Sequence, residues 1–476
     1  MPSGQYDFVV VANRLPVDQV GTDPDGSPRY ETSPGGLVTA MAPIMAAHDG
    51  AWVGWPGAPG EVGEAFDSDG IHLVPVPLTT EDVADYYEGM SNGTLWPLFH
   101  DVIAAPGYHR HWWDRYVEVN QRFADAAAAQ AAEGDPVWVQ DYQLLLVPAR
   151  LREQRPDLKI GFFNNIPFPG YEIFSQLPWR KQVVEGVLGA DLVGFQRRSD
   201  ATNFLRACRR AADAVTKGGT VQVEDATGRR EVRAAAFPIS IDAQAFEDMA
   251  TSPEVVARAE QIRTELGDPE TVLLGVDRLD YTKGIRHRLS TFAELLEDGT
   301  LDKESTVLVQ VASPSRERVQ AYSDLRDEVE LTVGRLNGDH GTVGFSPVHY
   351  LHQSFPREEM AALYLAADVM LVTALRDGMN LVAKEYVAAR HDGDGVLVLS
   401  EFAGAADELT QAVLINPHDI DGSKAAIVRA VRMPADERRR RMRAMRRRVK
   451  EHDVARWAKD FLGTLAGEPR EPQGQQ

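Results

Sequence analysis

Short, uninterrupted runs of apolar residues recur along this chain, with helix-like segments between them. Typical runs are FVVVA at residues 8–12, VLLGV at 272–276 and VLVL at 396–399. Because successive side chains of a strand point to opposite faces, a continuous apolar run predicts a strand that is covered on both sides. Such strands alternating with helices predict an α/β fold built on parallel sheets.

The runs form two series, one before and one after about residue 240. With 476 residues the chain is also too long for one core, since single domains stop growing near ~250–300 residues. We therefore expect two Rossmann-like domains that face each other across a ligand cleft. The strands are expected at residues 7–12, 137–139, 160–163, 192–195, 271–276, 306–311, 369–372 and 396–399, and helices at 256–266, 318–333 and 358–367.

The segment from Phe237 to Asp242 separates the two series and is the expected hinge. We place the N-terminal domain at residues 1–238 and the C-terminal domain at residues 239–455. Residues 456–466 are expected to form a helix that crosses back to the N-terminal domain. Residues 467–476 are rich in Gly, Pro, Glu and Gln, which predicts a disordered tail.

The net charge of −21 argues against binding to nucleic acid or to an anionic membrane surface, because an acidic chain repels other polyanions. No apolar run reaches the ~18–20 residues of a membrane span, and the first residues do not have the pattern of a signal peptide. We expect a cytoplasmic protein. An anionic substrate would need local positive charge against this overall field.

Cysteine and histidine usage gives little support to a metal site. Cys208 is the only cysteine, so an internal disulfide and a multi-cysteine metal site are excluded, and its surroundings predict a small packed residue. His109 and His111 are adjacent to no third ligand in the sequence, which favours packing. We expect no metal and no cofactor.

Several common nucleotide and nucleophile motifs are missing. The sequence contains no Gly-x-x-x-x-Gly-Lys-Ser/Thr loop, no clean Gly-x-Gly-x-x-Gly after the first strand and no Gly-x-Ser-x-Gly elbow. Kinase, dehydrogenase and serine hydrolase functions therefore lose most of their support.

The run GVDRLDYTKG at residues 275–284 places two cations, Arg278 and Lys283, just after a predicted strand. Ligands of open α/β sheets bind at the carboxyl ends of strands, so these two cations could clamp a diphosphate leaving group. A plain surface loop, with Arg278 paired to Asp277 or Asp280, fits the same run.

The run RDGMNLVAKE at residues 376–385 joins a second predicted strand to a helix. Unpaired backbone N–H groups from Gly378 to Leu381, at the positive end of the helix, would suit a phosphate. Glu385 lies further into the helix and could accept from ribose hydroxyls. A capped helix with a surface glutamate is the alternative.

Together these runs resemble those of retaining trehalose-6-phosphate synthases, which are GT-B glycosyltransferases, and the actinobacterial branch in particular. The resemblance extends from about Val9 to Leu465. Further matching landmarks are residues 11–16 (VANRLP), 35–37 (GGL), 52–55 (WVGW), 85–87 (DYY), 91–97 (SNGTLWP) and 315–316 (SR).

The resemblance implies a residue set for each substrate. The implied donor site comprises Gly36, Arg278, Lys283, Asp377, Gly378, Met379, Asn380, Leu381, Val382 and Glu385, with Ser354 and Phe355 facing the base. The implied acceptor site, for glucose 6-phosphate, comprises Arg14, Trp55, Tyr87, Trp96, Asp141 and Arg316. Asp141, Asn165, Arg278 and Lys283 are the implied catalytic set.

Two stretches depart from the family pattern. A His-Asp-Tyr-His motif is replaced by Gln140-Asp141-Tyr142-Gln143, and Asn165 stands where the family usually has a histidine beside the donor sugar. Asparagine can still form hydrogen bonds, but it cannot carry a proton or positive charge. A tuned site, an impaired site and a deliberately altered site all fit this change.

The implied reaction transfers glucose from a nucleoside diphosphate to glucose 6-phosphate with retention, giving α,α-trehalose 6-phosphate. The acceptor attacks from the face that the diphosphate leaves, and a diphosphate oxygen takes its proton. Ser354 and the actinobacterial likeness favour GDP-glucose, with UDP-glucose next. The alternatives are a pseudoglycosyltransferase that joins a cyclitol donor to an amino-cyclitol phosphate, and a weakly active sugar-phosphate sensor. The family forms homodimers and homotetramers, so an oligomer is expected.

Overall fold

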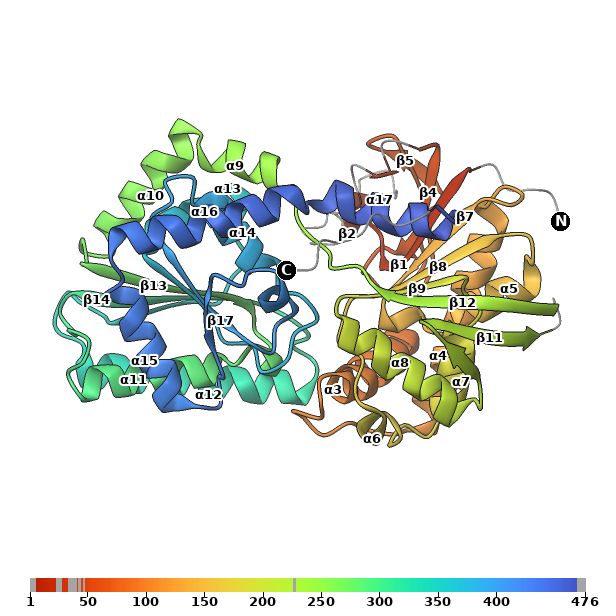
Figure 1. Ribbon diagram of the computed structural model, residues 1–476, viewed down its shortest axis with the longest axis horizontal. Coiled ribbons are helices and arrows are strands. Elements are labelled where there is room, and N and C mark those ends of the chain that lie inside the picture. The colour runs from red at the N-terminus through yellow and green to blue at the C-terminus, as the bar shows by residue number, and fades with distance from the viewer. Residues whose placement is uncertain are drawn as a thin grey trace. The chain divides into compact units, whose positions relative to one another are not determined.

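The chain divides into two compact units in a computed structural model (Figure 1). Unit 1 comprises Met1–Ile239 with Ala455–Gln476, and unit 2 comprises Ser240–Val454. The sequence places the corresponding boundaries after residues 238 and 455. The structure describes residues 6–22, 28–32, 41, 44–45, 48–225 and 228–468, so most of the predicted tail lies outside the described residues.

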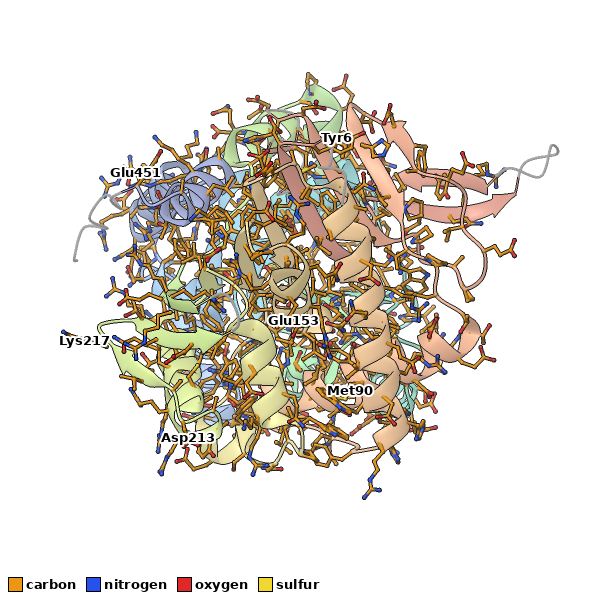
Figure 2. The ribbon with its side chains drawn as sticks, turned by 90° about the vertical axis from the view of Figure 1, so that its right-hand side faces the viewer. Tyr6, Met90, Glu153, Asp213, Lys217 and Glu451 are labelled. Carbon is orange, nitrogen blue, oxygen red and sulfur yellow. The ribbon has the colours of Figure 1, made fainter. Side chains whose placement is uncertain are left out.

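Among its described residues, unit 1 contains a ten-stranded sheet with the order β10-β11-β12-β9-β8-β7-β1-β4-β6-β5. The strands from β12 to β6 are parallel, and antiparallel strands extend both edges. Figure 2 labels Asp213 and Lys217 at the edge formed by β10 and β11. The strands are β1 (Phe8–Arg14), β4 (Gly50–Trp55), β5 (Phe66–Ser68), β6 (Ile71–Pro75), β7 (Pro136–Gln140), β8 (Lys159–Asn164), β9 (Leu192–Phe195), β10 (Val215–Lys217), β11 (Thr220–Asp225) and β12 (Gly228–Ala236), with a separate hairpin of β2 (Val17–Thr22) and β3 (Pro28–Thr32).

The helices of unit 1 include one unusual element, a π-helix (η1) of 13 residues at Val83–Leu95. π-Helical turns are rare and occur mostly at functional sites. The other helices are α2 (Thr80–Asp82), α3 (Trp96–Phe99), α4 (Arg110–Gln130), η2 (Tyr142–Leu144), α5 (Val147–Gln154), α6 (Tyr171–Phe174), α7 (Arg180–Val187), α8 (Arg198–Ala211) and α17 (Val454–Leu465).

Unit 2 is built on a six-stranded sheet of the described residues, all parallel, with helices on both faces (Figure 1). Its strands are β13 (Thr271–Arg278), β14 (Thr306–Ser313), β15 (Val348–Leu351), β16 (Val369–Val372), β17 (Val396–Ser400) and β18 (Val413–Ile415). Its helices are α9 (Ala243–Ala250), α10 (Pro253–Glu265), η3 (Tyr281–Lys283), α11 (Ile285–Glu297), α12 (Gln320–His340), α13 (Arg357–Ala366), α14 (Leu381–Ala389), η4 (Gly404–Asp407), α15 (Ile420–Val431) and α16 (Ala435–Glu451).

The eight predicted strands and the three predicted helices are all present, with boundaries shifted by a few residues at most, except that α12 extends seven residues further than predicted. Their side chains are buried as the apolar runs predict: β16 and β17 have no exposed residue. Cys208 is fully buried in α8, and burial raises the pKa of its thiol to about 12, which confirms a packed residue. Among the described residues, no helix combines the length and apolar character needed to cross a bilayer.

Among the parallel strands of each sheet, the strand order reverses at one place. In unit 2 the order is β15-β14-β13-β16-β17-β18, so successive strands run outward from β13 in one direction and from β16 in the other. In unit 1 the corresponding neighbours are β1 and β7. The loops after two such strands separate and leave a crevice at their carboxyl ends, where ligands of doubly wound sheets bind.

Helix α17 follows unit 2 in the chain but packs on the sheet of unit 1. The Phe461 ring stacks on Trp138 of β7, with centroids 4.4 Å apart and planes at 10°. A Cβ on Gly161 of β8 or on Gly194 of β9 would lie 2.7 Å from an atom of this ring, so only glycine fits at these two positions. The Trp457 Nε1–H donates to the Phe237 carbonyl at 3.2 Å, which holds the end of β12 against the same helix.

Replacing Phe461 by alanine should destabilise unit 1, because Phe461 is fully buried. The glycines that face its ring have no side chains to fill the cavity that the substitution leaves. We expect a loss of about 3–5 kcal/mol in the free energy of unfolding, measured by urea denaturation. Lys459→Ala, at an exposed position of the same helix, is the control and should change stability little. A loss in F461A as small as that of the control would contradict this packing.

Candidate active site

The charged side chains at the end of β13 and in the loop after it form separate ion pairs. Asp277 is bound to the buried Arg288, with Nη1 2.6 Å from Oδ2. Arg278 Nη2 lies 4.0 Å from Asp280, and the Arg278 side chain is 46% exposed. Asp277 therefore pairs with Arg288 rather than with Arg278, as the sequence had allowed. The guanidinium of Arg278 reaches solvent at the end of the strand.

Asp280 is fully buried and anchors the same loop. Arg316 Nη1 donates to its Oδ2 at 3.3 Å, and the Tyr322 hydroxyl donates to the same oxygen at 3.2 Å. The Thr282 N–H and hydroxyl both donate to Oδ1 at 2.9 Å. Burial raises the pKa of Asp280, but the cations Arg316, Arg278 and Lys283 outweigh it and the pKa is lowered. Asp280 therefore remains a carboxylate and holds Arg278 and Arg316 at the end of β13.

Lys283 joins this loop to the loop after β16. Its Nζ donates to Asp377 Oδ2 at 2.6 Å, and both side chains are mostly buried. The backbones are tied as well, since the Leu375 N–H donates to the Thr282 carbonyl at 2.7 Å. Gly284 has φ +66°, and a Cβ there would lie 2.1 Å from the Thr373 carbonyl oxygen, so the close approach requires glycine. The two predicted donor runs thus form one body.

Helix α14 begins at this junction. Asn380 has φ 96°, a conformation that asparagine tolerates better than most residues, and its Oδ1 accepts from the Ala383 N–H at 3.0 Å. Its Nδ2 donates to Asp377 Oδ2 at 3.1 Å. The first N–H groups of a helix have no partner within the helix. With Ala383 capped, Leu381 and Val382 supply the N–H groups suited to an anion at this helix end.

Residues 404 and 405, which the sequence analysis did not single out, support the Gly378–Met379 loop. The Gly404 N–H donates to the Asp377 carbonyl at 3.2 Å, and the Ala405 N–H donates to the Met379 carbonyl at 2.8 Å. A Cβ on Gly404 would lie 1.9 Å from the Gly378 carbonyl oxygen. The run EFAGAAD after β17 carried only a glycine between small residues as a signal of this contact.

Glu385, the predicted ribose contact, lies in α14 beside Tyr364 of α13. The Tyr364 hydroxyl donates to Glu385 Oε2 at 2.9 Å. Burial raises the pKa of Glu385, and the Tyr364 hydrogen bond opposes that shift. One carboxylate oxygen is thereby fixed, and the other is suited to accept from a hydroxyl pair.

The predicted base-facing residues follow β15. Ser354 is exposed, and Phe355 is half-buried. His352, two residues earlier, has its Nδ1 3.0 Å from the Ala312 carbonyl oxygen and its Nε2 3.3 Å from Glu317, which fixes the start of this loop to the end of β14.

In unit 1, Arg14 ends β1 and therefore lies at the strand reversal. Its guanidinium lies 4.9 Å from the centre of the Trp55 ring and is paired with Asp18. Trp55 ends the neighbouring β4 and contacts Tyr87 of the π-helix edge-on, with centroids 5.6 Å apart. Arg14, Trp55 and Tyr87 are thus brought together as one cationic and aromatic cluster, which suits a sugar phosphate.

Trp96, also predicted to contact the acceptor, is only 5% exposed. Its ring packs against His100, at 4.1 Å, and against Tyr142, at 5.6 Å. Most of the Trp96 side chain is therefore packed, and its contact with the acceptor stays a prediction. Arg316, predicted for the same substrate, belongs to unit 2, and Gly36 lies outside the described residues.

Asp141 and Asn165 follow β7 and β8 and are hydrogen-bonded to each other. Asp141 Oδ1 accepts from the Asn165 N–H at 3.2 Å and from the Tyr142 N–H at 3.0 Å. Asp141 has φ 76°, a strained value for a residue that is not glycine. Backbone strain of this kind is often found at functional sites.

Histidines and carboxylates form no metal centre in the part of the chain that the structure describes: no three His, Cys, Asp or Glu side chains are grouped closely enough. The His109 ring packs against Trp112 at 4.2 Å, and His111 lies 3.7 Å from Asp85. Both histidines are nevertheless exposed, His111 with 64% of its side chain, so the predicted packing is not confirmed for His111.

Two Rossmann-like units, one with a cationic loop pair at a helix N-terminus, define a nucleotide-sugar-dependent glycosyltransferase of the GT-B class. The sequence profile of glycosyltransferase family 20 matches residues 6–467. The chain belongs to this family.

Relatives and solved structures agree over nearly the whole chain. The trehalose-6-phosphate synthase of Mycolicibacterium gilvum is 58% identical over an alignment of 482 positions, gaps included, which covers 99% of this chain and 95% of the relative. A UDP-forming α,α-trehalose-phosphate synthase from Burkholderia xenovorans, solved with glucose 6-phosphate, is 34% identical with a TM-score of 0.88, over 97% of this chain and 100% of that one. An E. coli structure with UDP-2-fluoro glucose is 35% identical with a TM-score of 0.87, over 98% and 100%.

Gly404→Ala should weaken donor binding, because the added methyl group displaces the Gly378 carbonyl and with it the start of α14. We expect the KM for the nucleotide sugar to rise about tenfold, the effect of losing roughly 1.4 kcal/mol of binding. Gly334→Ala is the control, since a Cβ in the middle of α12 meets nothing within 4 Å. Steady-state kinetics with a folded G404A that keeps the parental KM would rule out this support.

Proposed function

We propose that this chain transfers glucose from a nucleoside-diphosphate glucose to the anomeric hydroxyl of glucose 6-phosphate, forming α,α-trehalose 6-phosphate. The observation that carries the proposal is the junction at Lys283 and Asp377, where two strand-end loops and the N-terminus of α14 meet beside Arg278. The named activity of relatives that are 58% identical supports the same reaction.

The chemical step needs charge stabilisation more than a nucleophile. The bond between the sugar's C1 and the diphosphate oxygen breaks, and a bond from C1 to the acceptor oxygen forms on the same face. The acceptor's proton goes to a diphosphate oxygen, so the charges balance without a protein base. Arg278, Lys283 and the N–H groups of Leu381 and Val382 would stabilise the negative charge that develops on the leaving group.

The acceptor would be held by the cluster of Arg14, Trp55 and Tyr87 in unit 1, with Asp141 and Asn165 toward the donor sugar. An arginine stacked on an indole ring can fork onto a phosphate while the aromatic faces cover C–H groups of the sugar. Within unit 2, Arg316 is anchored to Asp280 and is thereby coupled to the donor loop.

GDP-glucose is the donor that we favour, with UDP-glucose second. The support is Ser354, a small and exposed residue beside the half-buried Phe355, where a larger side chain would take up more of the space for a base. UDP-glucose gains support from the solved relatives, one named as UDP-forming and one bound with a UDP sugar. We also propose that neither a metal nor a cofactor takes part, and that the enzyme acts in the cytoplasm as a homo-oligomer.

A direct assay of nucleoside diphosphate release, with the products separated by chromatography, tests the reaction. Release should require glucose 6-phosphate, be fastest with GDP-glucose, slower with UDP-glucose and slowest with ADP-glucose, and persist in EDTA. No release with any of the three donors would favour a pseudoglycosyltransferase or a sensor. Faster release with UDP-glucose would overturn the base preference alone, and loss of release in EDTA would overturn the metal-free step.

Arg278→Ala should lower turnover by roughly 10²–10³-fold, the scale of losing one donor that stabilises developing charge. Arg326→Ala is a matched control, because Arg326 is 44% exposed in the same unit and pairs with Glu330 on the surface of α12. The comparison uses kcat at saturating donor and acceptor. Similar kcat values for R278A and R326A would sink the assignment of Arg278.

A further inference from the structure

Asn165 lies between two glutamine side chains of unit 1. Its Nδ2 donates to Gln140 Oε1 at 3.4 Å, and its Oδ1 accepts from Gln196 Nε2 at 3.4 Å. Gln140 is fully buried and Gln196 is 3% exposed, whereas Asn165 is only half-buried. Asn165 is therefore the one member of this amide chain with a face toward solvent.

A backbone group sets the direction of the amide chain. The Ile239 N–H can only donate, and it donates to Gln196 Oε1 at 2.9 Å. The Nε2 group of Gln196 must then face the other way, where it offers a donor to Asn165. That donor selects the Oδ1 atom of Asn165 and turns its Nδ2 toward Gln140.

Each bond to Asn165 is at the long end of the range for N–H···O contacts, so neither alone would hold the amide firmly. The two act on opposite ends of the same amide, and both favour the same one of its two orientations. Asn165 is also held through its backbone, since its N–H donates to Asp141 Oδ1. Side chain and backbone are thus fixed from three directions.

We propose that Gln196 and Gln140 are positioning residues that fix the orientation of the Asn165 amide for the hydroxyls of the donor sugar. This inference rests on the proposed function, which puts Asn165 at that sugar. The linked amides would hold a hydrogen-bond donor and an acceptor in fixed directions, as an oriented imidazole does, although none of them titrates. It begins at Ile239, the last residue of unit 1 before the chain enters unit 2.

A double-mutant cycle tests whether Gln196 acts through Asn165. Gln196→Leu should lower kcat/KM for the nucleotide sugar by about 3–10-fold, as expected for one neutral hydrogen bond, and leave the KM for glucose 6-phosphate unchanged. The double variant N165A/Q196L should be no slower than N165A alone. Losses that multiply, or a changed acceptor KM, would overturn the proposal.

Gln196→Glu gives a readout that a merely structural role would not move. When ionised, the carboxylate that this substitution introduces can still accept from the Ile239 N–H but offers no donor to Asn165, whereas its protonated form offers one. The rate of Q196E relative to wild type should therefore rise as the pH is lowered from 8 to 5. Gln176→Glu, at an exposed position of unit 1, adds the same charge and should give a flat ratio. A flat ratio for Q196E would contradict the orientation of the amide chain.

The failure of the proposed function is read separately from that of the amide chain. A wild-type chain that releases no nucleoside diphosphate overturns the function. The unfolding midpoints of wild type, N165A, Q196L and the double variant then test the contact without turnover. Non-additive midpoints support the link between residues 165 and 196, and additive midpoints overturn it.

Discussion

The reversal of strand order in each sheet is the constraint on which the sites depend. In a parallel sheet every connection must cross a face, and only where the order reverses do adjacent loops leave in opposite directions. In unit 2 the reversal between β13 and β16 brings Arg278 and Lys283 to the start of α14. In unit 1 the reversal between β1 and β7 brings Arg14 and Asp141 to one edge. The candidate site residues of each unit therefore lie at the loops where the strand order reverses.

An acidic chain that handles anions must keep its own carboxylates from neutralising the cations of the site. Around β13 this is achieved by distributing partners: Asp277 takes the buried Arg288, and Asp280 takes Arg316 and the Tyr322 hydroxyl. Arg278 remains half exposed at 4.0 Å from Asp280. The carboxylates thus reduce the electrostatic repulsion among several neighbouring cations, while Arg278 stays accessible to solvent.

The sequence predicted the strands, the two series of elements and the strand-end position of the two loops at Arg278 and Arg376, because apolar runs and glycine-rich strand ends are local signals. It did not predict the support of Gly378 by Gly404, or the amide chain at Asn165. Both depend on contacts between residues distant in the sequence, and neither leaves a periodic pattern. Trp96, which its motif predicts to touch the acceptor, is 5% exposed and packs against His100 and Tyr142, and its contact with the acceptor stays a prediction.

Helix α17 has a consequence for how the chain is made. Its seat on unit 1, between Gly161, Gly194 and Trp138, is filled by a ring that follows all of unit 2 in the sequence. During synthesis the sheet of unit 1 therefore emerges from the ribosome with an apolar slot uncovered, and more than two hundred residues, on the order of ten to forty seconds of translation, pass before Phe461 can fill it. The nascent chain is most exposed to wrong partners in that interval.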